Sequence, residues 1–356
     1  MPSGIRSTCG DAGDATGVRG VTPVPVVDLR DAPGRLRAGL REAGHRVGFF
    51  YLTGHGVPPE LVTRVLGAAR RLFELPQADK DSVAMVRSPH FRGYTRLGGE
   101  LTRGEVDWRE QIDIGPQRPP IGGLGRSDYR WLQGPNQWPA ALPELPGIVE
   151  EWDAALSSVA RTLLRHWAAA LGSPADVFDS AFAETPATLI KIIRYPGHAG
   201  SSQGVGAHRD AGVLTLLLAE PESRGLQVRR CSDDGWIDVP PRDGAFIVNI
   251  GELLEAATRG YLRATEHRVN LQGRPGDRIS VPYFFNPRLD ARVPVLSLPP
   301  ELSAPAAHSD QRWTPSRDPG DPIFSVYGRN AWKSRLRSHP DVASAHGFSA
   351  ARGDRE

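Results

Sequence analysis

The chain has 356 residues, which is long enough for one large domain or two ordinary ones. Its formal net charge is only +2, so bulk electrostatics gives no reason to expect a nucleic acid or an acidic membrane surface as partner. Two cysteines, no apolar run near the roughly 18 residues of a membrane span, and no hydrophobic signal core at the N-terminus together predict a cytoplasmic protein without a disulfide framework.

The first 75 residues predict a tail followed by short strands and helices. Residues 1–22 are rich in Gly, Asp, Ser and Thr and are expected to be disordered, because they offer few large apolar groups. Strands are expected at 24–29 and 48–53, and helices at 33–46 and 58–75. The second helix has a proline near its start, apolar residues at helical spacing and another proline directly after it.

The middle of the chain contains its longest periodic segment. Residues 88–145 hold many Gly, Pro and Arg residues and are expected to form loops and short strands over a pocket. Large apolar residues then repeat at steps of three and four from Ile148 to Leu171. This spacing predicts a long amphipathic helix that ends at Gly172, with its tryptophans in the core rather than on a binding face.

From residue 187 onward the pattern changes to short strands separated by Gly and Pro turns. Such closely spaced strands are typical of a barrel or a sandwich. The predicted strands are 188–195, 213–218, 226–229, 236–239, 245–249, 263–270 and 278–285. A basic amphipathic helix at 327–337 is expected to pack on this domain, and a C-terminal tail is expected over 346–356.

Two histidines and one aspartate carry the strongest chemical signal. His208 and Asp210 are two residues apart, so on an extended chain their side chains project to the same side and one metal ion can bind both. His267 lies far along the chain, and a rolled sheet would bring it back to them. Two imidazoles and one carboxylate on one face of a metal leave positions open for oxygen and a co-substrate, which favours non-haem Fe(II), although zinc accepts the same ligands.

An arginine and a serine follow on a later strand. Arg278 and Ser280 are also two residues apart, so they point to the same face of the strand and can together bind a carboxylate. The strand around them is apolar, which argues against the alternative of an exposed surface ion pair. A carboxylate clamp favours iron over zinc, because it would hold a bidentate oxo-acid at the open metal positions.

These motifs, in this order, resemble the Fe(II)- and 2-oxoglutarate-dependent dioxygenases of the isopenicillin N synthase-like superfamily. The resemblance extends over nearly the whole chain. Matching segments besides the metal motifs are Val24–Leu29, Gly48–Val57, Phe91–Tyr94, Asp107–Glu110, Ile193–Pro196, Gly225–Val228, Gly244–Gly251 and Arg278–Pro287. One departure is Arg194, which stands beside Tyr195 where Asn or Tyr is common and puts the geometry of the co-substrate pocket in question.

The resemblance implies an α+β fold whose mainly β core is a double-stranded β-helix, or jelly roll, with flanking helices. It implies that His208, Asp210 and His267 bind the catalytic iron, and that Arg278, Ser280 and Tyr195 bind 2-oxoglutarate. Packing alone is the alternative role for Tyr195. Three residues of the central region are candidates for contact with the substrate, where Arg92 would favour a carboxylate: Arg92, Tyr94 and Gln111.

The expected organisation is a single dioxygenase domain over 23–345, with an N-terminal part at about 23–140 and a catalytic part at about 187–290. The implied reaction uses O2 and 2-oxoglutarate to hydroxylate, desaturate or cyclise a small molecule, with release of succinate and CO2, in specialised or antibiotic biosynthesis. One alternative is an oxidase of the same fold that does not use 2-oxoglutarate. Another is a non-catalytic barrel that binds a small acid. The sequence predicts no nucleic-acid or membrane partner and leaves the oligomeric state open.

Overall fold

The structure is a computed structural model that describes residues 24–197, 202–221, 223–230, 235–273, 276–303 and 322–349. The predicted disordered tail at 1–22 lies outside these residues, as does most of the predicted C-terminal tail. None of the described helices is both long and apolar enough to cross a membrane.

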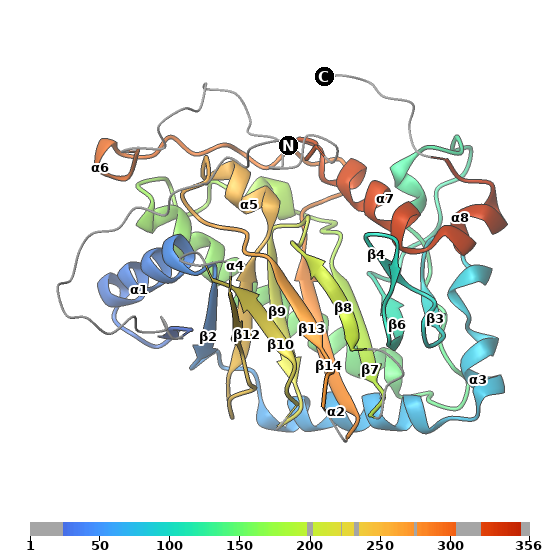
Figure 1. Ribbon diagram of the computed structural model, residues 1–356. Helices are drawn as coiled ribbons and strands as arrows, with labels where there is room; N and C mark the ends of the chain where they lie inside the picture. The colour runs from blue at the N-terminus through green and yellow to red at the C-terminus, as the bar shows by residue number, and fades with distance from the viewer. Residues whose placement is uncertain are drawn as a thin grey trace, which may run out of the picture.

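Two sheets lie face to face in the centre of the molecule (Figure 1). The major sheet has the order β1 (Val26–Asp28), β2 (Phe49–Thr53), β12 (Phe246–Ile250), β9 (Leu214–Ala219), β14 (Arg278–Phe285), β7 (Leu189–Tyr195), β6 (Glu110–Ile114) and β3 (Gly93–Thr95). The minor sheet has the order β11 (Trp236–Asp238), β10 (Leu226–Arg229), β13 (His267–Asn270) and β8 (Gln203–His208). A hairpin of β4 (Leu101–Thr102) and β5 (Glu105–Val106) lies beside them.

From β7 to β14 the chain alternates between the two sheets, with β10 and β11 as a hairpin within the minor one. This alternation produces the double-stranded β-helix that the resemblance implied. The sheets are held together by apolar side chains from both, such as Phe49 and Ile247 against Leu226 and Val228. Strands β9 and β12 are almost entirely buried, because one sheet face meets the minor sheet and the other meets helices.

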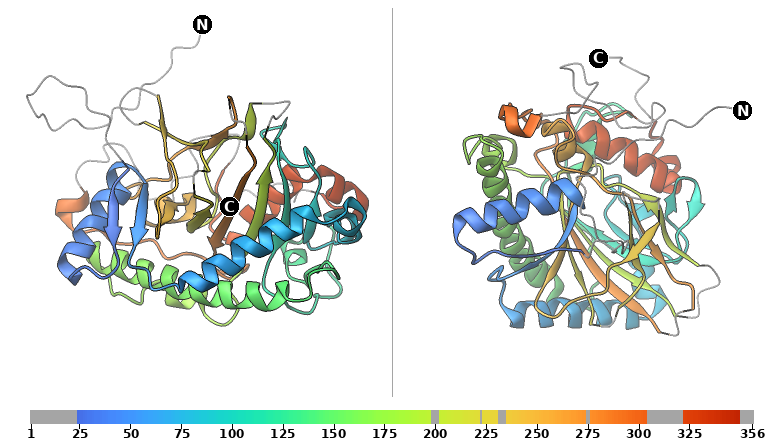
Figure 2. Two further views of the ribbon diagram at one scale, coloured as in Figure 1. Left: turned by 90° about the horizontal axis from the view of Figure 1, so that it is seen from below. Right: turned by 60° about the vertical axis from the view of Figure 1, so that its left-hand side comes forward.

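Helices cover the outer face of the major sheet, where α2 (Pro59–Glu74) and α4 (Leu145–Ala170) run side by side below the strands (Figure 2). In α4 the predicted three- and four-residue spacing buries Trp152, Leu156, Leu163 and Trp167 against the sheet. Helix α1 (Pro33–Arg46) packs on α4. The remaining helices are α3 (Gln77–Ser82), α5 (Glu252–Ala257), α6 (Pro300–Ser303), α7 (Tyr327–Ser338) and α8 (Pro340–His346), with short 3-10 turns at Met85–Arg87, Tyr129–Leu132 and Asp179–Phe182.

The C-terminal region differs from its prediction. The tail was expected to begin at residue 346, but the described residues up to 349 pack on the domain. The ring of Phe348 lies 4.9 Å from the ring of Trp332, 5.3 Å from that of Trp131 and 5.9 Å from that of Phe91. Together with α8, which was not predicted, this aromatic cluster packs the C-terminal helices against the 3-10 turns at Met85–Arg87 and Tyr129–Leu132.

Candidate metal centre

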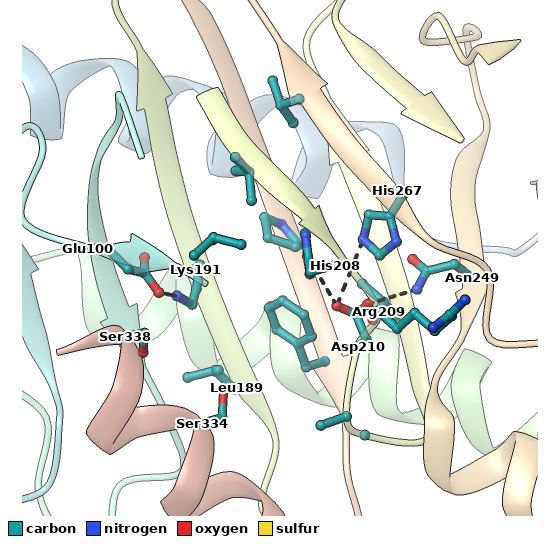
Figure 3. A pocket seen from close by; sticks show the side chains of 18 of the residues that line it. Glu100, Leu189, Lys191, His208, Arg209, Asp210, Asn249, His267, Ser334 and Ser338 are labelled. Carbon is teal, nitrogen blue, oxygen red and sulfur yellow. Dashed lines mark hydrogen bonds and ion pairs between the residues drawn. The ribbon is translucent and has the colours of Figure 1, made fainter. Parts of the chain in front are cut away.

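The two histidines meet because their strands are neighbours in the minor sheet. His208 is the last residue of β8, and His267 is the first residue of β13. The antiparallel register pairs them directly, with their ring centroids 4.3 Å apart. Asp210 follows β8 by two residues and turns its carboxylate toward both rings (Figure 3). Three residues separated by up to 59 positions therefore meet at one end of the barrel.

The three side chains present one ligand atom each to a common point. The Oδ1 atom of Asp210 lies 3.7 Å from Nε2 of His208 and 3.8 Å from Nε2 of His267. The Nδ1 atom of each histidine faces a backbone carbonyl oxygen instead, at 2.8 Å from Gly206 in one case and 3.1 Å from Thr265 in the other. A proton on Nδ1 donates to that carbonyl and leaves the Nε2 lone pair for a metal.

The other oxygen of Asp210 is held by the protein. Its Oδ2 atom accepts hydrogen bonds from Oγ1 of Thr215 at 2.5 Å and from Nδ2 of Asn249 at 2.7 Å. Thr215 belongs to β9 and Asn249 to β12, which pair with each other at exactly these residues. The major sheet therefore orients the carboxylate so that Oδ1 alone faces the two histidines.

The charges of this group also suit a divalent cation. Burial alone would raise the pKa of Asp210, but His267, His208 and the two hydrogen bonds lower it below its ordinary value. Burial, with His267 beside it, lowers the pKa of His208 to about 4. At neutral pH the site therefore holds an ionised carboxylate and a neutral imidazole, which are the forms that bind metal. Two nitrogen donors and one oxygen donor on one side form the facial set that non-haem Fe(II) uses.

A pocket of about 780 Å³ opens in front of these ligand atoms. Arg278 and Ser280 line the same pocket from β14 and are 4% and 1% exposed. Nη1 of Arg278 donates to Oγ of Ser280 at 3.0 Å, and its Cζ lies 4.7 Å from the ring centre of Tyr195, its register partner on β7. The structure thus brings together the six residues that the resemblance assigned to iron and co-substrate.

Arg194, where the sequence departs from the family pattern, does not reach this pocket. Arg194 alternates with Tyr195 on β7 and points to the other face of the sheet. There it pairs with Glu110 at 2.5 Å, and its Cζ lies 5.8 Å from the ring centre of Phe73. It is absent from the residues that line the pocket, so it leaves the co-substrate end unchanged.

The three candidates for substrate contact lie outside the pocket lining. Arg92 is buried and donates to the carbonyl oxygen of Leu132. The hydroxyl of Tyr94 bonds to Glu110, and the amide of Gln111 donates to Asp113 at 2.6 Å. These side chains hold β3, β6 and the neighbouring loop together, so the structure does not support their prediction as substrate contacts.

The residues that do line the far side of the pocket were missed. They come from the loop before β4, from β7 and from α7: Glu100, Lys191, Ser334, Arg335 and Ser338. The sequence offered one signal, since Lys191, Ile193 and Tyr195 alternate on β7 and must share a face. Asn249 and Thr215 were also missed as ligand-orienting residues, although both lie on strands that were predicted.

The comparisons with known families agree with this geometry. Residues 24–141 match the family described as non-haem dioxygenase in morphine synthesis N-terminal, and residues 187–287 match the 2OG-Fe(II) oxygenase superfamily. The chain belongs to the 2OG-Fe(II) oxygenase superfamily. It is therefore a 2-oxoglutarate-dependent dioxygenase, and His208, Asp210 and His267 fit the Fe(II) that this family uses.

Individual relatives agree with this family assignment. The 2-oxoglutarate-dependent dioxygenase frbJ of Dothideomycetidae sp. (strain 11243) is 34% identical over 336 residues, which cover 90% of each chain. Homoarginine-6-hydroxylase 2-ODD-C23 of Glycine max is 36% identical and covers 71% of this chain and 78% of its own. Among solved structures, a 2OG-Fe(II) oxygenase family protein from Caulobacter crescentus superposes with a TM-score of 0.70 at 26% identity, covering 89% of this chain and 99% of its own.

Proposed function

We propose that this dioxygenase hydroxylates a small metabolite, and that Arg278 and Ser280 hold the far carboxylate of 2-oxoglutarate while it is bound at the iron. The observation that carries this proposal is a buried guanidinium and a buried hydroxyl, two residues apart on β14, in the same pocket as the metal ligands. The planar fork of an arginine donates two parallel hydrogen bonds to a carboxylate, and a hydroxyl beside it can donate a third.

Each residue has a defined part in the proposed reaction. Arg278 and Ser280 bind and orient the co-substrate, and the ring of Tyr195 beneath Arg278 keeps the guanidinium from swinging away. The histidines and Asp210 hold the metal with one face toward the pocket. Bound iron, with 2-oxoglutarate and O2, would supply oxidation of a substrate C–H bond and release succinate and CO2.

The relatives support hydroxylation as the outcome. Those from Glycine max, Arabidopsis thaliana and Oryza sativa are named homoarginine-6-hydroxylases, and they are 32–36% identical to this chain. Their name pairs hydroxylation with a polar amino acid. Desaturation and cyclisation are the alternative outcomes at such a centre. Specialised metabolism in the cytoplasm stays the sequence-based prediction for the setting of this enzyme.

The competing activity is an oxidase in which Arg278 binds the carboxylate of the substrate itself. The relatives named as 2-oxoglutarate-dependent weigh against it. The test is a screen of candidate metabolites for stimulated release of succinate from the Fe(II)-loaded enzyme. One succinate per hydroxylated product supports the proposal. Product formation without consumption of 2-oxoglutarate would replace it with the oxidase.

A further inference from the structure

The end of the pocket away from the metal is lined by charged and hydroxyl-bearing side chains. Figure 3 shows Glu100 and Lys191 joined by an ion pair on the opposite side of the pocket from His208, Asp210 and His267. Ser334 and Ser338 of α7 lie on the same side as this pair. Lys191 and Tyr195 are four positions apart on β7, so the pair lies roughly 13 Å along the strand from the co-substrate end.

Glu100 and Lys191 belong to a chain of buried charges of alternating sign. Nζ of Lys191 lies 2.8 Å from Oε1 of Glu100 and 3.4 Å from Oδ2 of Asp113. Beyond Glu100, Nη2 of Arg109 lies 2.8 Å from its Oε2 and 3.2 Å from Oδ2 of Asp107. At the other end, Nη1 of Arg335 on α7 lies 2.5 Å from Oδ2 of Asp113. All six residues are buried, and their charges cancel.

Stability is a weak reason for such a chain at a pocket wall. Removing charges from water costs several kcal/mol per ion, and well-packed apolar residues of similar size often serve as well or better. Recognition of a polar ligand is a stronger reason. Burial alone would raise the pKa of Glu100, but Arg109, Lys191 and His339 hold it well below its ordinary value, so the carboxylate is ionised.

Both pocket-facing members keep hydrogen-bonding capacity for a ligand. An ammonium group has three donors; Lys191 donates one to Glu100, and its ion pair with Asp113 at 3.4 Å occupies at most one more. A carboxylate has about four acceptor positions, and Glu100 uses three of them on Lys191, Arg109 and His339. A spare donor on Lys191 and a spare acceptor on Glu100 therefore lie side by side at the wall, on two groups that are themselves paired at 2.8 Å. A ligand that carries both charges keeps the chain neutral, whereas a simple anion or cation leaves one buried charge uncompensated.

We propose, on the basis of the function proposed above, that the prime substrate is a free α-amino acid with an extended side chain. Its carboxylate binds Lys191, with the hydroxyls of Ser334 and Ser338 beside it, and its ammonium group binds Glu100. The side chain of the substrate then extends along β7 toward the iron, where one of its C–H bonds is oxidised. Glu100 and Lys191 thereby set substrate specificity without touching the reacting carbon.

The first test uses the full-length protein, loaded anaerobically with Fe(II) and 2-oxoglutarate, in calorimetric titrations with the proteinogenic L-amino acids. The tightest binder is then compared with its decarboxylated amine and with its deaminated acid. We expect both analogues to bind at least about tenfold more weakly, because each leaves one wall charge unmatched. The inference would be overturned if no amino acid binds. It would also be overturned if either analogue binds as tightly as the amino acid from which it is derived.

Single-residue variants test whether the substrate carboxylate binds Lys191 and its ammonium group binds Glu100. Lys191→Met should weaken binding of the amino acid at least about tenfold and leave binding of the decarboxylated amine nearly unchanged. Glu100→Gln should also weaken binding of the amino acid at least about tenfold, but should leave binding of the deaminated acid nearly unchanged. Lys80→Met is the matched control, because Lys80 is also buried and paired, 3.1 Å from Glu110, but does not line the pocket. If Lys80→Met weakens the amino acid as much as Lys191→Met does, the pairing with Lys191 is wrong.

Two further measurements keep the outcomes distinct. If Lys191→Met does not fold, Ser338→Ala provides a milder change at the same wall, and unchanged amino-acid affinity in that variant would count against this orientation. The visible charge-transfer band of iron with 2-oxoglutarate is recorded in every sample. Loss of the band in the wild-type protein would contradict the proposed function, whereas a normal band without amino-acid binding would contradict this inference alone.

Discussion

Replacing Thr215 with valine should release the carboxylate of Asp210 and weaken iron binding. Valine keeps the shape of threonine but removes the hydroxyl that donates to Oδ2 at 2.5 Å. Only Asn249, at 2.7 Å, would then hold that oxygen. The carboxylate could rotate, so Oδ1 would no longer be held between the two Nε2 atoms.

The expected loss of Fe(II) affinity follows from the kind of hydrogen bond that the substitution removes. A bond to a charged group contributes roughly 1.5–3 kcal/mol, and each 1.4 kcal/mol is about a factor of ten in affinity. Loss of a residue that orients a metal ligand typically costs roughly 10- to 100-fold in metal affinity. We therefore expect Thr215→Val to raise the Kd for Fe(II) by about tenfold or more, and Asn249→Leu to have an effect of similar size.

The assay is an anaerobic competition for Fe(II) between the protein and a chelator, with the melting temperature of the apoprotein recorded in parallel. Thr95→Val is the matched control, because Thr95 is also buried in a strand but lies outside the pocket lining. If Thr215→Val binds Fe(II) as tightly as the wild-type protein, the hydrogen bonds to Oδ2 do not orient the ligand and the reasoning is wrong.

Three other perturbations test the site. His267→Ala should abolish turnover and lower the iron content, because it removes one of three protein ligands, and wild-type activity would disprove the assignment. Arg278→Leu should raise the 2-oxoglutarate concentration needed for half-maximal turnover at least about tenfold, while Arg194→Leu, on the other face of the sheet, should not. The pKa of Glu100 lies below its ordinary value of 4.5 in the folded protein, so its contribution to stability is complete above pH 4.5 and is lost as the pH falls below it. The free energy of unfolding in urea should therefore fall less between pH 7 and pH 3.5 for Glu100→Gln than for the wild-type protein.

Regular elements were predictable because their periodicity is local. The strands at Leu226–Arg229 and Arg278–Phe285 and the helix at Pro33–Arg46 have the predicted bounds. Strand β8 was not predicted, since Gly204 and Gly206 interrupt its apolar pattern and pairing with β13 supplies its order. The strand predicted at 263–270 begins only at His267, because Arg263 and Thr265 bond to the backbone near α1 instead of a neighbouring strand.

The metal ligands were predictable from motif spacing, but the substrate wall was not. Arg92, Tyr94 and Gln111 were chosen from a region whose direction relative to the pocket is set by how β3 pairs with β6. The observed wall instead combines Glu100 and Lys191 with α7, a helix near the far end of the chain. Helix α7 was expected only to pack on the domain. Its buried Arg335, held by Asp113, is what places Ser334 and Ser338 at the pocket.

The most direct test of the central claim is anaerobic addition of 2-oxoglutarate to the Fe(II)-loaded protein, followed by visible absorption spectroscopy. We expect a weak charge-transfer band that saturates with 2-oxoglutarate, is absent from His267→Ala, and requires a much higher 2-oxoglutarate concentration in Arg278→Leu. Normal iron binding by the wild-type protein without any such band would contradict the assignment of Arg278 and Ser280 to the co-substrate.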